Sequence, residues 1–167
     1  YNNPVETLPS SIGNLRRLKV LKVWKCDLRS VVSELGRLSA LEELDLSDNR
    51  IGRLPQELGR LHHLKRLYLD KNLLSFLPPE LGEISALEKL SLAYNELQSV
   101  PPSFGSLGNL QSLNLSKNRL ERLPEELTNA DNLETLDLEG NPLQSFPQSS
   151  PKWEHLKILN LKTCNLS

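Results

Sequence analysis

The stretch LEELDLSDNRIGRLPQELGRLHH, residues 41–63, decides the fold of this chain, because its pattern recurs every 23 residues. Leucine marks the first place of each unit at Leu18, Leu41, Leu64, Leu87, Leu110, Leu133 and Leu156. Residues 18–155 therefore hold six full repeats, residues 1–17 are the tail of an earlier repeat, and residues 156–167 begin a seventh. We expect residues 1–167 to form one domain, in which each repeat contacts only its neighbours.

Each repeat predicts a short strand followed by a short helical turn. Places 4 and 6 are apolar around a polar place 5, as at Leu44 and Leu46, which is typical of a strand with one buried face. Proline at place 15, as at Pro55, precedes apolar residues three apart, which suits a short α or 3₁₀ turn. Glycine at place 19, as at Gly59, indicates close packing.

A unit of 23 residues cannot bury its own leucines, so successive repeats must stack and share one core. The predicted fold is an α/β solenoid, a curved arc with a parallel β-sheet on its concave face and short α or 3₁₀ segments and loops on its convex face. Repeat one departs from the pattern at Val31-Val32, because the other repeats have an apolar residue followed by proline at these two places. In repeat six, Ser150 takes an apolar place and Pro151 follows, so we expect a distorted segment there with Trp153 filling the core.

Place 9 carries an amide in most repeats. An asparagine side chain can donate to one backbone carbonyl and accept from one backbone N–H, which satisfies buried polar groups where the chain leaves the strand. Two cysteines share this place six repeats apart, roughly 29 Å at the spacing of parallel strands. They are too far apart for a disulfide, so we interpret them as small ladder residues. The predicted structural ladder comprises Cys26, Asn49, Asn72, Asn95, Asn118, Asn141 and Cys164.

These residues carry a family resemblance. The pattern L-x-x-L-x-L-x-x-N-x-L followed by L-P-x-x-L-G-x-L resembles the 23-residue leucine-rich repeats of intracellular scaffolds, such as the scribble-like and Ras-pathway scaffold proteins. The resemblance covers essentially the whole chain and implies a protein-binding role, often in signalling. The same repeats also accompany GTPase, kinase, phosphatase and ubiquitin-ligase domains and occur in immune receptors, so the fold does not by itself define the role.

Composition and spacing argue against several other functions. The 20 Lys and Arg balance 21 Asp and Glu, which removes the electrostatic reason to expect a nucleic-acid partner. No apolar run approaches the roughly 20 residues of a membrane span. His62, His63 and His155 lack further ligands at metal-binding spacing, so we predict no metal and no cofactor. Asp45 and Asp137 share place 5 but lie about 19 Å apart, too far for a catalytic carboxylate pair. We predict no enzymatic activity.

Places 3, 5, 7 and 8 are expected to face outward on the concave side. Opposite charges in adjacent strands, such as Lys22 with Asp45 or Lys25 with Asp48, would support the sheet without any partner. That interpretation does not explain the three large aromatic residues at these places, Trp24, Tyr68 and Tyr94. Aromatic residues flanked by Arg and Lys are typical of binding hot spots. The candidate protein-binding residues are Lys22, Trp24, Lys25, Asp45, Asp48, Arg66, Tyr68, Asp70, Lys89 and Tyr94.

All of these residues belong to repeats one to four, whereas repeats five and six offer mostly Ser, Asn, Thr and Gly. We therefore predict a monomeric scaffold or adaptor that binds a protein or peptide on the N-terminal half of the concave face. The two unpaired ladder cysteines favour a reducing, cytoplasmic location. Two alternatives stay open: the recognition arm of a larger enzyme, and an innate-immune-type receptor. We expect a longer parent protein, because position 1 is not Met and neither end has a polar capping segment.

Overall fold

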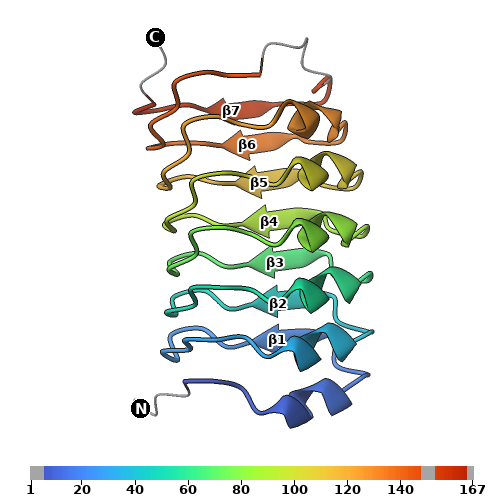
Figure 1. Ribbon diagram of the computed structural model, residues 1–167. Helices are drawn as coiled ribbons and strands as arrows, with labels where there is room; N and C mark the ends of the chain where they lie inside the picture. Colours follow the sequence, from blue (N-terminus) through green and yellow to red (C-terminus); the bar gives the residue numbers. More distant parts are fainter. Residues whose placement is uncertain (1–5, 148–152, 165–167) are drawn as a thin grey trace.

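The computed structural model of the chain describes residues 6–147 and 153–164. Seven parallel strands form one sheet in sequence order, and short helices stack beside them as a second layer (Figure 1). Each strand occupies places 3 to 5 of its repeat and pairs with residues 23 positions away, as Leu21 does with Leu44. The strands are β1 (Val20–Lys22), β2 (Glu43–Asp45), β3 (Arg66–Tyr68), β4 (Lys89–Ser91), β5 (Ser112–Asn114), β6 (Thr135–Asp137) and β7 (Ile158–Asn160). The predicted solenoid with a parallel sheet is confirmed.

The helical segments are 3₁₀ helices of five residues each, at places 16 to 20. They are η1 (Ser10–Asn14), η2 (Ser33–Arg37), η3 (Gln56–Arg60), η4 (Pro79–Glu83), η5 (Pro102–Ser106) and η6 (Glu125–Asn129). The residue before each helix is extended, as at Pro55 with φ −72° and ψ 141°. Val32 adopts the same conformation without a proline ring, at φ −75° and ψ 142°, so repeat one keeps the fold despite its departure from the pattern.

Glycine at place 19 lets successive helices approach closely. A Cβ atom on Gly13 would stand 2.8 Å from the backbone oxygen of Glu34 in the next repeat, closer than real Cβ contacts allow. Gly36, Gly59 and Gly82 are likewise buried within their helices. The close packing predicted for place 19 is therefore confirmed.

The core is a continuous column of leucine between the strands and the 3₁₀ helices. The place-4 residues of the central strands are buried, and each contributes roughly 1.5–3 kcal/mol by leaving water. At the C-terminal end Trp153 is buried as predicted, with its indole Nε1 donating to the Leu127 carbonyl at 3.1 Å and its ring edge-on to Phe146 at 5.7 Å. Ser150 and Pro151, where we predicted a distorted segment, lie outside the described residues.

Candidate functional site

The place-9 asparagines connect each repeat to the one before it. The amide nitrogen of Asn72 donates to the backbone oxygens of Leu46, at 3.0 Å, and Leu69, at 3.1 Å, and its Oδ1 accepts from the Ile51 N–H at 3.0 Å. Each amide thus donates to at least two carbonyls rather than the one we predicted, because its nitrogen sits between the place-6 carbonyls of two successive repeats. The same pattern holds at Asn49, Asn95, Asn118 and Asn141.

The two cysteines at place 9 supply only part of this arrangement. The Cys164 thiol donates to the Leu138 carbonyl at 3.2 Å, the same place-6 acceptor that an asparagine would use. The Cys26 thiol instead donates to the carbonyl of Trp24 at 3.2 Å. Both thiols are free and half-buried rather than fully buried. A thiol is a weak donor and its sulfur is only a weak acceptor. It therefore replaces the NH₂ group of the asparagine side chain but not its carbonyl oxygen.

Place 8 turns the chain from the strand into the ladder through a left-handed backbone. Lys25, Lys71 and Tyr94 have φ values of 54°, 53° and 56°, and Gly140 occupies the same place in repeat six with φ 72°. Glycine adopts this conformation readily, whereas larger residues seldom do. The backbone therefore does not favour the tyrosine of repeat four, whose side chain is nevertheless 55% exposed.

The three aromatic residues of the concave side differ in exposure. Trp24 is 52% exposed, and Lys25 Nζ lies 5.3 Å from the centroid of its ring. Tyr68 is half-buried instead of projecting fully into water, and the Nζ atom of Lys89 stands 5.4 Å from its ring centroid. Both contacts place a cation against an aromatic ring, the arrangement in which the ring quadrupole attracts positive charge. The water-facing aromatic surface is thus supplied mainly by Trp24 and Tyr94.

A shared carboxylate organises the charges of the first three strands. Glu43 lies between Lys22, whose Nζ is 2.7 Å from Oε1, and Arg66, whose Nε is 2.8 Å from Oε2. Its hydrogen bonds, with Lys22 first and Arg66 second, lower the pKa of the Glu43 carboxyl, and Glu43 raises the pKa of both cations. The candidate set omitted Glu43, although its opposite charge to Arg66 at the same place of adjacent repeats is a usable signal.

Lys22 forms its close ion pair with Glu43, at 2.7 Å, and not with Asp45, whose charge raises the pKa of Lys22 less than Glu43 does. Asp45 makes a different close contact. Its Oδ1 accepts the backbone N–H of Ser47 at 3.0 Å, a local turn contact where the strand ends. The other predicted pair is present, with Lys25 Nζ 3.9 Å from Asp48 Oδ2.

Not all of the expected outward places are exposed. Asp70 reaches across to the next repeat, where its Oδ1 accepts from the Ser91 hydroxyl at 2.6 Å and the Ala93 N–H at 2.7 Å. Ser91, Ala93 and Ser116 are buried, contrary to the expectation for places 5 and 7. Their side chains are too short to emerge between larger neighbours, so these three places add little accessible surface.

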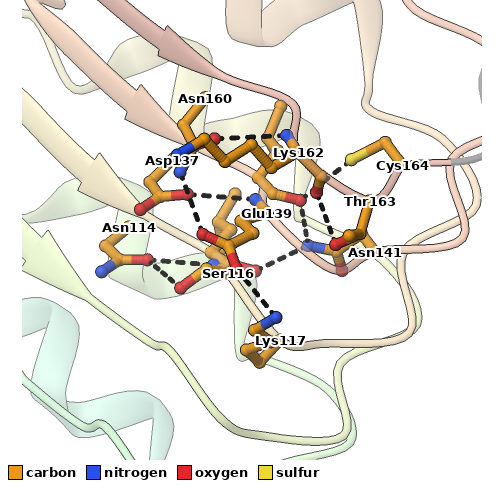
Figure 2. Close-up of polar contacts among 12 residues, drawn as sticks. Asn114, Ser116, Lys117, Asp137, Glu139, Asn141, Asn160, Lys162, Thr163 and Cys164 are labelled. Carbon is orange, nitrogen blue, oxygen red and sulfur yellow. Dashed lines mark hydrogen bonds and ion pairs between the residues drawn. The ribbon is translucent and has the colours of Figure 1, made fainter.

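The polar residues of repeats five to seven bind one another (Figure 2). Asn114 Oδ1 accepts from both the backbone N–H and the hydroxyl of Ser116, at 2.9 and 2.7 Å. Glu139 pairs with Lys117 at 2.9 Å and accepts from the amide of Asn160 at 3.3 Å. These contacts, that of Lys117 first, lower the pKa of the Glu139 carboxyl. The hydrogen-bonding capacity of this end is therefore largely used within the chain.

A second side-chain ladder, which sequence reasoning missed, runs along place 23 in the C-terminal repeats. Asn109 Nδ2 donates to the Ser85 carbonyl at 2.7 Å, and His155 Nδ1 lies 3.1 Å from the Asp131 oxygen. Asn132 continues the series to the Gly108 carbonyl. In repeats one to three this place holds Ala40, His63 and Ala86, which line a hollow beside the Lys19–Glu42–Lys65 ion pairs. The change from alanine to asparagine at place 23 is the sequence signal for the ladder.

Two features bear on other functions. Among the described residues, no group of three or more His, Cys, Asp or Glu side chains is arranged to hold a metal ion. Within the same part of the chain, every helix is too short or too polar to cross a bilayer.

Comparisons with known proteins agree with this architecture. A family model described as a leucine-rich repeat region matches residues 6–113, and a second leucine-rich repeat model matches residues 85–143. No curated protein matches the chain. Among solved structures, a leucine-rich repeat protein of Leptospira interrogans is 34% identical with a TM-score of 0.95, over 99% of this chain and 42% of that one.

Two further structures share the fold at lower identity. A plant peptide hormone receptor, RGFR1, in complex with RGF2 is 27% identical with a TM-score of 0.76, over 98% of this chain and 31% of that one. The LRIM1/APL1C complex is 24% identical with a TM-score of 0.80, over 87% of this chain and 28% of that one. The chain thus spans less than half the length of each of these three proteins. Because one family model covers more than half of its residues, the chain belongs to the leucine-rich repeat family.

Proposed function

We propose that this chain is a protein-interaction module that binds another protein or a peptide through the concave side of repeats one to four. The observation that carries the proposal is the exposure of two large aromatic side chains on the concave side, Trp24 at 52% and Tyr94 at 55%. Aromatic side chains that are exposed in the free protein become the energetic centre of many interfaces, because they bury a large area with few rotatable bonds.

Two observations support this location. The cation beside Trp24 belongs to Lys25, so a partner that covers the ring also meets a positive charge. Place 8 is left-handed in repeats one to seven, and Tyr94 is the aromatic residue among its occupants, an exposed ring at a place that glycine would adopt most readily. Among the similar structures, a peptide hormone receptor, RGFR1, is in complex with RGF2, which is consistent with peptide binding by this kind of solenoid.

The proposal extends to a role as a monomeric scaffold or adaptor in cytoplasmic signalling, with no catalysis of its own. The two free cysteines are compatible with a reducing compartment. Two alternatives stay open: the recognition arm of a larger enzyme and an innate-immune-type receptor. In either case the proposed binding face is the same, and only the partner and its consequence differ.

The decisive experiment selects peptides from a displayed random library against the chain and measures their affinity for variants. Trp24→Ala and Tyr94→Gly should each weaken binding about tenfold or more, the range of interface hot spots. Tyr94→Gly should leave the melting temperature nearly unchanged, because relief of the left-handed strain offsets the greater flexibility of glycine in the unfolded chain.

Thr163→Gly is the matched control, because Thr163 has the same backbone conformation at place 8, with φ 55°, beyond the proposed surface. Its substitution should leave affinity unchanged. Selected peptides that bind all of these variants as tightly as the native chain would show that the concave side of repeats one to four is not the binding face.

A further inference from the structure

A second exposed apolar surface lies away from the strands, in the loops that lead to the 3₁₀ helices. Leu73, at place 10, and Phe76, at place 13, are 50% and 45% exposed. The other full repeats carry Asp, Arg, Glu or Pro at place 10 and Ser or Arg at place 13. Repeat three therefore replaces two polar places of one loop with large apolar residues, and the fold needs neither of them for its core.

The stacking of repeats places arginines in the same row as Phe76. The guanidinium carbon of Arg53, one repeat earlier at place 13, stands 5.4 Å from the centroid of the Phe76 ring. Continuing along place 13, Ser99 follows in repeat four and Arg122 in repeat five. At the spacing of parallel strands, three repeats separate Arg53 from Arg122 by about 14 Å.

The charges of this edge are unbalanced in a way that favours an acidic partner. Places 10, 12 and 13 of repeats two to five hold four arginines against two glutamates. Arg50 pairs with Asp27 at 3.2 Å and Arg119 pairs with Glu96 at 3.3 Å. Among the ion pairs of the described residues, none within 4.0 Å includes Arg53 or Arg122. These two guanidinium groups are therefore available to carboxylates from outside.

The C-terminal part of this edge, from Leu77 to Arg122, is also hollowed. Two shallow hollows, of about 510 and 460 Å³, share Ser99 and Arg122 and are lined by residues of repeats three to six, whereas Arg53, Leu73 and Phe76 line neither of them. Prolines line the second hollow, among them Pro101 and Pro124. Proline rings are rigid, so a groove that they line loses little conformational entropy on binding.

We propose that this edge of repeats two to five binds an acidic peptide segment of another protein. In this arrangement one carboxylate meets Arg53, an aliphatic or aromatic side chain covers Phe76 and Leu73, and a second carboxylate meets Arg122. An extended chain advances about 3.3 Å per residue, so the two acidic residues are about four positions apart, with the apolar residue one or two positions after the first. This site is separate from the concave face.

The test uses a labelled peptide with two glutamates four residues apart and a leucine after the first, and a matched peptide with glutamines in place of the glutamates. The native 167-residue chain should bind the acidic peptide about tenfold more tightly than the glutamine peptide, and added salt should weaken binding. The double variant Arg53→Glu/Arg122→Glu should reduce affinity at least tenfold, and Phe76→Ser should reduce it severalfold.

The control variant Arg37→Glu/Arg60→Glu makes the same change in net charge on exposed residues of η2 and η3. It should retain binding, and all variants should keep the native melting temperature. The proposal would be overturned if the chain did not bind the acidic peptide, or if the control variant lost as much affinity as Arg53→Glu/Arg122→Glu. It would also be overturned if the chain self-associated and buried Phe76 in the contact. Trp24→Ala should leave this peptide's affinity unchanged, so failure here is distinguishable from failure of the concave site.

Discussion

Repeats one to four and repeats five and six share one fold but present opposite kinds of surface. In the first region Trp24 and Tyr94 expose aromatic rings. In the second, Asn114, Lys117 and Glu139 direct their polar atoms at neighbouring residues of the same chain. A surface whose polar groups already have partners gains little from a ligand, whereas exposed apolar area gains free energy whenever it is covered. The ability to bind can therefore differ along a solenoid whose core does not change.

The largest predicted effect tests whether the asparagine ladder stabilises the two regions equally. Asn72→Ala and Asn118→Ala should each lower the free energy of unfolding by about 1–3 kcal/mol, because each leaves buried backbone groups without a partner. Urea unfolding monitored by circular dichroism would measure both. Asn129→Ala, on an exposed residue of η6, is the control and should change stability by less than about 0.5 kcal/mol.

Because the hydrogen bonds of Asn72 and Asn118 have nearly the same geometry, the two losses should agree. A difference above about 1 kcal/mol would mean that the regions differ in their cores as well as in their surfaces.

A smaller effect is expected at place 23, where the second ladder begins only at Asn109. Ala86→Asn should extend it by one repeat, with the new amide donating to the His62 carbonyl. We expect stability to rise by up to about 1 kcal/mol, the net value of one hydrogen bond. Ala86→Ser, whose hydroxyl is too short to span the repeats, is the control. A melting temperature that falls with Ala86→Asn would show that the hollow of the first repeats cannot accept the ladder.

The smallest predicted effect concerns the shared carboxylate of the N-terminal strands. Lys22→Gln should raise the pKa of the Glu43 carboxyl, and Arg66→Gln should raise it by less, because the hydrogen bond with Lys22 is the larger cause of its lowering. Neither change should move the pKa of Glu139, which Lys117 lowers four repeats away. A carbon-detected NMR titration of the side-chain carboxyl groups would follow each residue.

The sign of the pH dependence follows from the same contacts. The pKa of Glu43 is lowered in the folded chain, so its contribution to stability is full above the ordinary glutamate pKa of 4.5 and is lost as the pH falls through the lower folded value. In Lys22→Gln this acid loss should be smaller. An equal acid loss in the variant and the native chain would show that the pair with Lys22 does not form in solution.

Much of the fold was predictable because the same places are apolar or carry asparagine in each repeat. Leu44 and Leu67, at place 4, are buried for the same reason, and Asn72 bonds between repeats wherever place 9 recurs. The surface was less predictable, because periodicity says which way a side chain points but not which neighbour reaches it. Asp70 illustrates the difference, because its carboxylate accepts a hydrogen bond from Ser91 in the next repeat. Ser91 is buried there, although the pattern alone predicts that its place is exposed.

The sequence by itself determined the period, the stacking and the leucine core of the inner repeats, because a unit of 23 residues can bury its hydrophobic places only against neighbouring units. The tertiary structure decided the rest. It assigned Glu43 to two cations, bent place 8 into a left-handed turn and brought Arg53 against Phe76. The physical reason is that long polar side chains choose among several partners within reach, and the choice depends on distances between repeats that no single repeat contains.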